Sequence, residues 1–155
     1  MSEAPRGGYR HLSPYLIVDD GDRALRLYAE AFGGAETMRL MGPDNAVMHA
    51  EIRLGDSVLM LAAATADMDV AKVRDDQWPT VSLVLPVEDC DAAYERAVAA
   101  GMHTEQPPTD MFYGERSAKL RDPFGHRWSL MSTVEALTPQ EIQQRIDAMT
   151  APEAS

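Results

Sequence analysis

Two residues with acid–base chemistry, His49 and Glu51, lie two positions apart in the segment VMHAEIRL. The segment alternates apolar and polar residues, which is typical of a β-strand, so both side chains should share one face, about 7 Å apart. An imidazole beside a carboxylate makes an acid–base pair or half of a metal site. The same two groups also form structural hydrogen bonds on surface strands, and the sequence leaves these alternatives open.

A second group of polar and aromatic residues lies toward the end of the chain. In the segment RWSLM, Arg127 and Ser129 alternate with apolar neighbours, so they should share one strand face. Before it, the loop TDMFYGER has Phe112 and Tyr113 as stacking surfaces and Arg116 as a partner for a carboxylate. Alternatively, the two rings pack the loop onto the sheet and Arg116 pairs with a neighbouring acid.

Composition limits the class of partner. The chain has 155 residues and a formal net charge of −11, which disfavours nucleic acid because phosphates would be repelled. No apolar run is long enough to cross a membrane. The single cysteine, Cys90, excludes an internal disulfide and fits a reducing cytoplasm, where we expect the protein. Because its neighbours are acidic, we expect a structural role for Cys90 rather than a reactive thiol.

Two segments that should position these residues repeat one pattern: VDDGDRALRLYAEAFG at 18–33 and VEDCDAAYERAVAAG at 87–101. Their first residues, Val18 and Val87, are 69 positions apart. Each segment contains a strand end, an acidic turn suited to capping, and an amphipathic helix closed by glycine. Strand-like stretches follow each copy, so the sequence predicts an α+β fold in which a βαβββ unit occurs twice.

The expected boundaries follow from turn and cap residues. Module one spans about residues 11–62, a linker 63–79, module two about 80–133, and a C-terminal helix 138–149. Further strands are expected at 36–40, 47–54, 57–62, 103–105, 116–121 and 126–132. The inward helix faces are expected to consist of Ala24, Leu27, Tyr28 and Phe32 in the first copy and Ala93, Ala97 and Val98 in the second.

The segments PYLIVDD, LYAEAFGG, VMHAEIRLGDSVLML, VEDCDAAYERAVAAG and DMFYGERSAKLRDPFGHRWSL, in this order and with the repeat, resemble the vicinal oxygen chelate superfamily. That superfamily includes glyoxalase I, extradiol dioxygenases, fosfomycin-resistance enzymes and bleomycin-binding proteins. The match looks closest to its PhnB-like subgroup and covers roughly residues 12–135. The resemblance implies two modules whose curved sheets form a shared cavity, and it implies homodimers.

Metal-dependent members of the superfamily carry one His or Glu on the first and last strand of each module. Counted from the turns, the matching positions here are Ser13, Met60, Ser82 and Ser129, and both pairs of equivalent positions are 69 residues apart. Three hydroxyls and a thioether are poor ligands for a divalent cation. We therefore predict no metal and no other cofactor at this site.

The expected cavity lining mixes apolar surface, hydroxyls and one positive charge, which is typical of a pocket for a medium-sized organic molecule. We predict a metal-free small-molecule binding protein that sequesters, or confers resistance to, an antibiotic or metabolite; aromatic guests, and cationic ones because of the net charge, are favoured. The alternatives are a lyase, isomerase or dioxygenase-like enzyme centred on His49 and Glu51, and a structural role with a filled cavity. The predicted ligand-binding residues are Tyr15, His49, Glu51, Met60, Ser82, Phe112, Tyr113, Arg116, Arg127 and Ser129.

Overall fold

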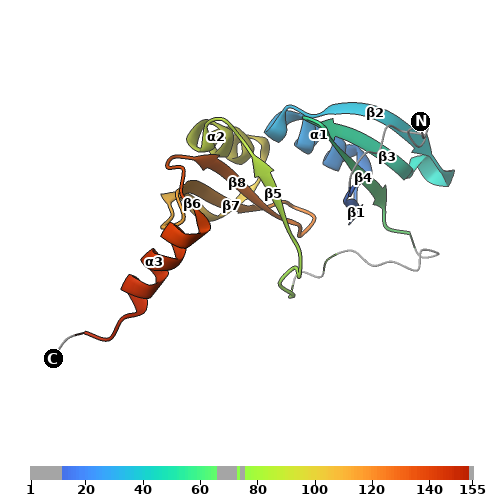
Figure 1. Cartoon of the computed structure of the whole chain (residues 1–155). Helices are drawn as coiled ribbons and strands as arrows, with labels where there is room; N and C mark the ends of the chain where they lie inside the picture. Colours follow the sequence, from blue (N-terminus) through green and yellow to red (C-terminus); the bar gives the residue numbers. More distant parts are fainter. Residues whose placement is uncertain (1–11, 66–72, 74–75, 154–155) are drawn as a thin grey trace, which may run out of the picture.

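The computed structural model describes residues 12–65, 73 and 76–153, which form two modules followed by a helix (Figure 1). Module one contains β1 (Tyr15–Val18), α1 (Gly21–Phe32), β2 (Ala35–Met41), a 3₁₀ turn η1 (Pro43–Asn45), β3 (Val47–Leu54) and β4 (Ser57–Ala63). Module two contains β5 (Ser82–Pro86), α2 (Cys90–Ala100), β6 (His103–Asp110), β7 (Glu115–Arg121) and β8 (Arg127–Thr133). Helix α3 (Pro139–Thr150) follows.

Each module has one four-stranded sheet, and the two sheets share a topology. The strand orders are β1-β4-β3-β2 and β5-β8-β7-β6. In both, the first strand lies parallel to the last strand of its module, and the remaining pairs are antiparallel. The predicted α+β fold, with two βαβββ modules in tandem and a C-terminal helix, is therefore confirmed.

The two repeat helices begin and end at the residues that the sequence pattern indicates. The Asp20 carboxylate accepts a hydrogen bond from Arg23 N at the start of α1, and Asp89 accepts one from Ala92 N at the start of α2. Both helices end at a left-handed glycine, Gly33 with φ of 69° and its counterpart in module two with φ of 115°. Equivalent caps in both copies give helices of 12 and 11 residues against the two sheets.

Helix α1 makes the contact between the modules. The ring of Phe32 lies 4.5 Å from that of Trp128 on β8, and Tyr28 packs on the edge of Phe124. The Tyr28 hydroxyl donates a 2.7 Å hydrogen bond to Asp122; burial, and then the Asp122 charge, raises the pKa of Tyr28 well above its ordinary value. The helix-bearing face of each sheet is thus turned toward the other module, and the opposite, open faces point away from this contact.

Strand β6 extends beyond the expected residues 103–105 and ends at Asp110. The prediction stopped early because Pro107 and Pro108 cannot donate to a strand ladder. The structure accommodates both prolines since β6 is the edge strand of its sheet and its register with β7 shifts between Gln106 and Thr109.

One residue of an expected inward helix face, and the whole of helix α3, are not buried in this chain. Val98 is 39% exposed, so its predicted place on the inward face of α2 is wrong; the fully buried Ala97 holds that position and the next residue turns outward. Helix α3 begins with a capping box between Thr138 and Glu141, none of its residues is buried, and it projects from the body of the molecule (Figure 1). Within the described part of the chain, no helix combines the length and apolar character needed to cross a bilayer.

Candidate functional site

The open face of the first sheet brings together four of the predicted binding residues. In register, Tyr15 on β1 pairs with Met60 on β4, and Met60 pairs with Glu51 on β3. Residues paired directly across a ladder point to the same side, so these three form one row, and His49 lies two residues from Glu51 on that face. The alternate residues of β3, such as Ile52, are buried beneath α1.

Tyr15, His49 and Glu51 form a chain of hydrogen bonds on this face. His49 Nε2 lies 3.1 Å from Glu51 Oε1, and His49 Nδ1 lies 3.3 Å from the Tyr15 hydroxyl. Glu51 is only 3% exposed, whereas Tyr15 is 47% exposed. When the Glu51 carboxylate accepts a hydrogen bond from His49 Nε2–H, the neutral imidazole has no proton on Nδ1. Nδ1 can then accept a hydrogen bond from the Tyr15 hydroxyl and polarise its O–H bond.

Apolar side chains surround this polar chain. Met38 lies opposite Glu51 and Leu40 opposite His49 across the β2–β3 ladder, and these side chains are 38% and 54% exposed. The face therefore combines an open apolar surface with a buried carboxylate at its centre, a composition typical of ligand sites rather than of a solvated sheet face.

The open face of the second sheet contains three more predicted residues. Ser82 pairs with Arg127, and Ser129 lies two residues further along β8 on the same side. Ser129 is 8% exposed and lies 3.4 Å from the hydroxyl of Ser117. The hydroxyls are thus largely occupied by each other, whereas the Arg127 side chain is 28% exposed.

Sequence reasoning missed the partners of Arg127 on this face. Glu105 on β6 contacts both Arg121 and Arg127, with closest N–O separations of 2.6 and 2.5 Å, and the Trp78 ring lies over the two guanidinium groups. The alternation of Lys119 and Arg121 along β7 was a readable signal. The orientation of the Glu105 side chain could not be predicted from the sequence, because a register shift between Thr104 and Gln106 determines it.

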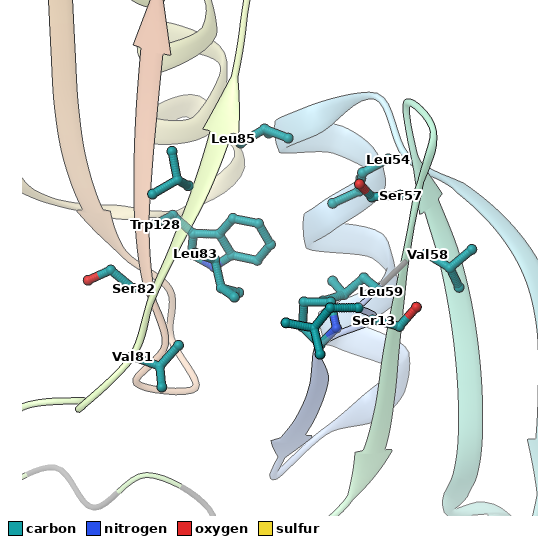
Figure 2. Close-up of a pocket in the computed structure, with 13 residues that line it drawn as sticks. Ser13, Leu54, Ser57, Val58, Leu59, Val81, Ser82, Leu83, Leu85 and Trp128 are labelled. Carbon is teal, nitrogen blue, oxygen red and sulfur yellow. The ribbon is translucent and has the colours of Figure 1, made fainter. Parts of the chain in front are cut away.

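The two modules enclose a cleft of about 460 Å³, lined mainly from their helix-bearing faces and partly from the edge strand β5 and the residues before β1 (Figure 2). Its lining is mainly apolar, with Leu54 and Leu59 from module one facing Leu83 and Trp128 from module two. Among the four positions equivalent to metal ligands, Ser13 and Ser82 line this cleft, whereas Met60 and Ser129 are not part of its lining. Within one chain, the predicted site residues therefore lie in separate groups.

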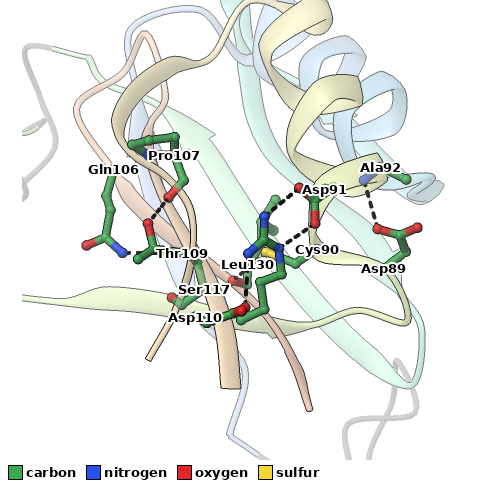
Figure 3. Close-up of polar contacts among 11 residues, drawn as sticks. Asp89, Cys90, Asp91, Ala92, Gln106, Pro107, Thr109, Asp110, Ser117 and Leu130 are labelled. Carbon is green, nitrogen blue, oxygen red and sulfur yellow. Dashed lines mark hydrogen bonds and ion pairs between the residues drawn. The ribbon is translucent and has the colours of Figure 1, made fainter. Parts of the chain in front are cut away.

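The loop residues Phe112, Tyr113 and Arg116 lie apart from both open faces. Arg116 pairs across the sheet with Asp110 and Ser132, and its guanidinium binds Asp91 of α2 at 2.6 Å and Asp110 at 2.9 Å (Figure 3). These two carboxylates hold Arg116 on the helix side of the sheet. The rings of Phe112 and Tyr113 pack edge to face at 5.1 Å, and α3 bonds the Phe112 carbonyl through Arg145.

Cys90, at the start of α2, is buried and donates to the Leu130 carbonyl at 3.5 Å (Figure 3). Burial, together with the neighbouring Asp91 carboxylate, raises the pKa of the Cys90 thiol. The thiol is therefore a poor nucleophile at neutral pH, as the acidic neighbours in the sequence indicate.

The donor set at the four metal-equivalent positions does not fit a divalent cation. Hydroxyl and thioether groups occupy them, and Ser13 and Met60 belong to different groups of side chains. Across the described residues, no cluster of three or more His, Cys, Asp or Glu side chains is arranged to hold a metal ion. His49 with Glu51 supplies two ligand side chains, fewer than the three or four that a zinc site uses.

Comparisons of sequence, of structure and with family models relate this chain to the same group of known proteins. An uncharacterized protein of Mycobacterium tuberculosis is 36% identical over 138 residues, covering 85% of this chain and 79% of the relative. TioX from Micromonospora sp. ML1 superposes with a TM-score of 0.65 at 25% identity, covering 81% of this chain and 99% of TioX. The fosfomycin resistance protein FosX from Mesorhizobium loti shares the fold, with a TM-score of 0.62 at 19% identity, covering 85% and 97%. Residues 8–130 match the model of the Glyoxalase/Bleomycin resistance protein/Dioxygenase superfamily, so the chain belongs to that superfamily.

Proposed function

We propose that this protein binds a small organic molecule without a metal ion, for sequestration of, or resistance to, an antibiotic or metabolite. The observation that carries the proposal is the open face of the first sheet, where the 3% exposed Glu51 lies within an exposed apolar surface. His49 holds the Glu51 carboxylate in place at 3.1 Å, and a guest that covers this face would remove the surrounding apolar side chains, such as Leu40, from water. Membership of a superfamily that includes fosfomycin-resistance proteins adds support.

The binding cavity is proposed to require two copies of the chain. The open faces of the two sheets point away from each other within one chain, so neither face alone encloses a ligand. Their edge strands β1 and β5 each pair on one side only, and Tyr15 and Val84 on these edges are 47% and 57% exposed. In a homodimer, the first sheet of one copy and the second sheet of its partner would form the two walls of one cavity.

Ligand binding should raise the melting temperature of protein that has been treated with a chelator. A compound bound at a concentration of 100 Kd stabilises the folded state by about 2.7 kcal/mol, which shifts the melting temperature by several degrees. The measurement is a thermal-shift screen of aromatic, cationic, anionic and neutral metabolites with no metal added. Hits should lose their shift in a Glu51→Gln variant; a library without a single hit would overturn the proposal.

A second candidate function is catalysis of a proton transfer, and the hydrogen-bonded chain of Tyr15, His49 and Glu51 favours it. In this mechanism Glu51 orients the His49 ring, His49 takes the proton of the Tyr15 hydroxyl, and the resulting phenolate takes a proton from the bound substrate; the two proton transfers then reverse to return a proton to the product. This would be a lyase or isomerase-like enzyme with a site unlike that of its metal-dependent relatives.

For this second candidate, a Tyr15→Phe variant should keep ligand affinity within about threefold while losing turnover of a hit compound by about a hundredfold or more. Turnover is followed by proton–deuterium exchange of the hit compound in heavy water. Equal exchange by the wild type and the variant would exclude the relay. Stoichiometric zinc, iron or manganese that is lost in His49→Ala would instead place a metal at His49.

A further inference from the structure

One patch of the second sheet's open face has a charge opposite to that of the whole protein. Register places Arg121 opposite Arg127, and Lys119 opposite Ser129, on the face that points away from α2. The residues between them on β7 and β8, Leu120 and Trp128, are buried on the other side. Three cationic side chains therefore gather on two adjacent strands of a chain whose formal net charge is −11.

Within the described part of the chain, Glu105 is the carboxylate that pairs with these charges. Glu105 is 12% exposed and accepts hydrogen bonds from Arg121 Nε at 2.8 Å and from Arg127 Nε at 2.5 Å. Among the described residues, Lys119 forms no ion pair or side-chain hydrogen bond. Glu115 also belongs to this face of β7, but it lies four residues from Lys119, about 13 Å along the strand. The side chains of Lys119, Arg121, Arg127 and Glu105 together therefore carry an excess of about two positive charges.

Trp78 completes the patch with an aromatic surface. The guanidinium carbons of Arg121 and Arg127 lie 4.7 and 5.5 Å from the centre of the Trp78 ring, within the range of cation–π contacts. Trp78 is nevertheless 72% exposed, so much of its ring remains accessible to a planar ligand. Glu105 and Trp78 together restrict both guanidinium groups, which lowers the entropy cost of binding an anion.

We propose that this patch, formed by Lys119, Arg121, Arg127 and Trp78, binds the oxyanion of a small aromatic carboxylate or phosphate, whose ring stacks on Trp78. The inference rests on the proposed small-molecule function and assigns its ligand class. The net charge of the protein favours cations at long range, but screening limits that field to about 8 Å at physiological salt. Inside the site, the nearby guanidinium and ammonium groups decide the sign of the ligand.

The test is calorimetric titration of the metal-free protein with four probes: 4-nitrobenzoate, 4-nitrophenyl phosphate, neutral 4-nitrobenzamide and inorganic phosphate. We expect at least one of the two aromatic anions to bind about tenfold or more tightly than the amide, and their ranking distinguishes carboxylate from phosphate. Arg127→Gln should weaken the preferred anion about tenfold or more. Trp78→Ala should weaken it several-fold while leaving inorganic phosphate unchanged.

Arg26→Gln is the matched control, since it removes the same charge from an exposed position on α1 and should change affinity less than twofold. If Arg127→Gln and Arg26→Gln lose the same amount of affinity for the anion, the anion is attracted by the overall charge of the protein rather than by this patch. That result would overturn the proposal. Amide binding as tight as that of both anions would also overturn it. If no anion binds while a neutral or cationic compound from the thermal-shift screen does, the patch fails and the proposed function stands; if nothing binds at all, both fail.

Discussion

Replacing Asp122 with alanine is expected to lower the free energy of unfolding by about 4 kcal/mol, the largest stability effect of any polar substitution proposed in this protein. Asp122 is 3% exposed and accepts four hydrogen bonds. Its Oδ2 accepts from the Tyr28 hydroxyl at 2.7 Å and from Trp128 Nε1 at 3.0 Å. Its Oδ1 accepts from the backbone N–H groups of Phe124 and His126. Alanine would leave all four donors without this acceptor in a buried region.

The two oxygens of Asp122 bind different groups, so their contributions to stability can be measured separately. Oδ1 shapes the β7–β8 turn, whereas Oδ2 joins this turn to α1 of the other module. Asp122→Asn can retain the first function and lose the second, so it should cost roughly half as much as the alanine variant. In a double-mutant cycle, Tyr28→Phe should lose most of its effect once Asp122 has been replaced by alanine.

Urea unfolding of the variants measures these differences. Asp56→Ala, in the exposed β3–β4 turn, is the matched control and should change the free energy of unfolding by less than about 0.5 kcal/mol. A similar, small effect of Asp122→Ala would show that water or neighbouring groups replace the carboxylate, and that this contact does not hold the modules together.

The fold could be predicted from the sequence because the signals that determine it are local. Asp20 and Asp89 indicate helix starts, Gly33 indicates a helix end, and the spacing of 69 residues between Val18 and Val87 indicates a duplicated unit. These signals depend on a residue and its nearest neighbours. The length of β6 was missed because its prolines are tolerated only at a sheet edge, and strand order is a property of the whole sheet.

The candidate site was accessible only where strand alternation determines it. The period of two residues correctly indicated that His49 and Glu51 share a face, and the structure adds Tyr15 as the third member of the chain. Contacts between distant segments were not accessible. The pairing of Arg116 with Asp91 spans 25 residues, and the position of Trp78 over Arg127 joins an irregular segment to a strand. Neither contact has a periodic signal.

Mixing two variants that each lack ligand binding should restore binding, if the cavity is shared between two copies. Glu51→Gln damages the first-sheet wall and Arg127→Gln damages the second-sheet wall. In a mixed dimer, one cavity receives both damaged walls and the other receives both intact walls. After random exchange of subunits, about half of the dimers are mixed, so about one quarter of all cavities should bind the tightest aromatic anion of the calorimetric series.

A cavity confined to one chain gives a different result in this experiment, because each chain then carries one damaged wall and the mixture binds nothing. Diluting wild-type protein with an equal amount of the Glu51→Gln, Arg127→Gln double variant provides the reciprocal control. A shared cavity predicts that about one quarter of all cavities remain active, whereas a cavity within one chain predicts about one half. Calorimetric stoichiometry after exchange in mild denaturant measures both mixtures. Restoration in the first mixture would therefore assign Glu51 and Arg127 to opposite walls of one site, although they lie on open faces that point apart within the single chain.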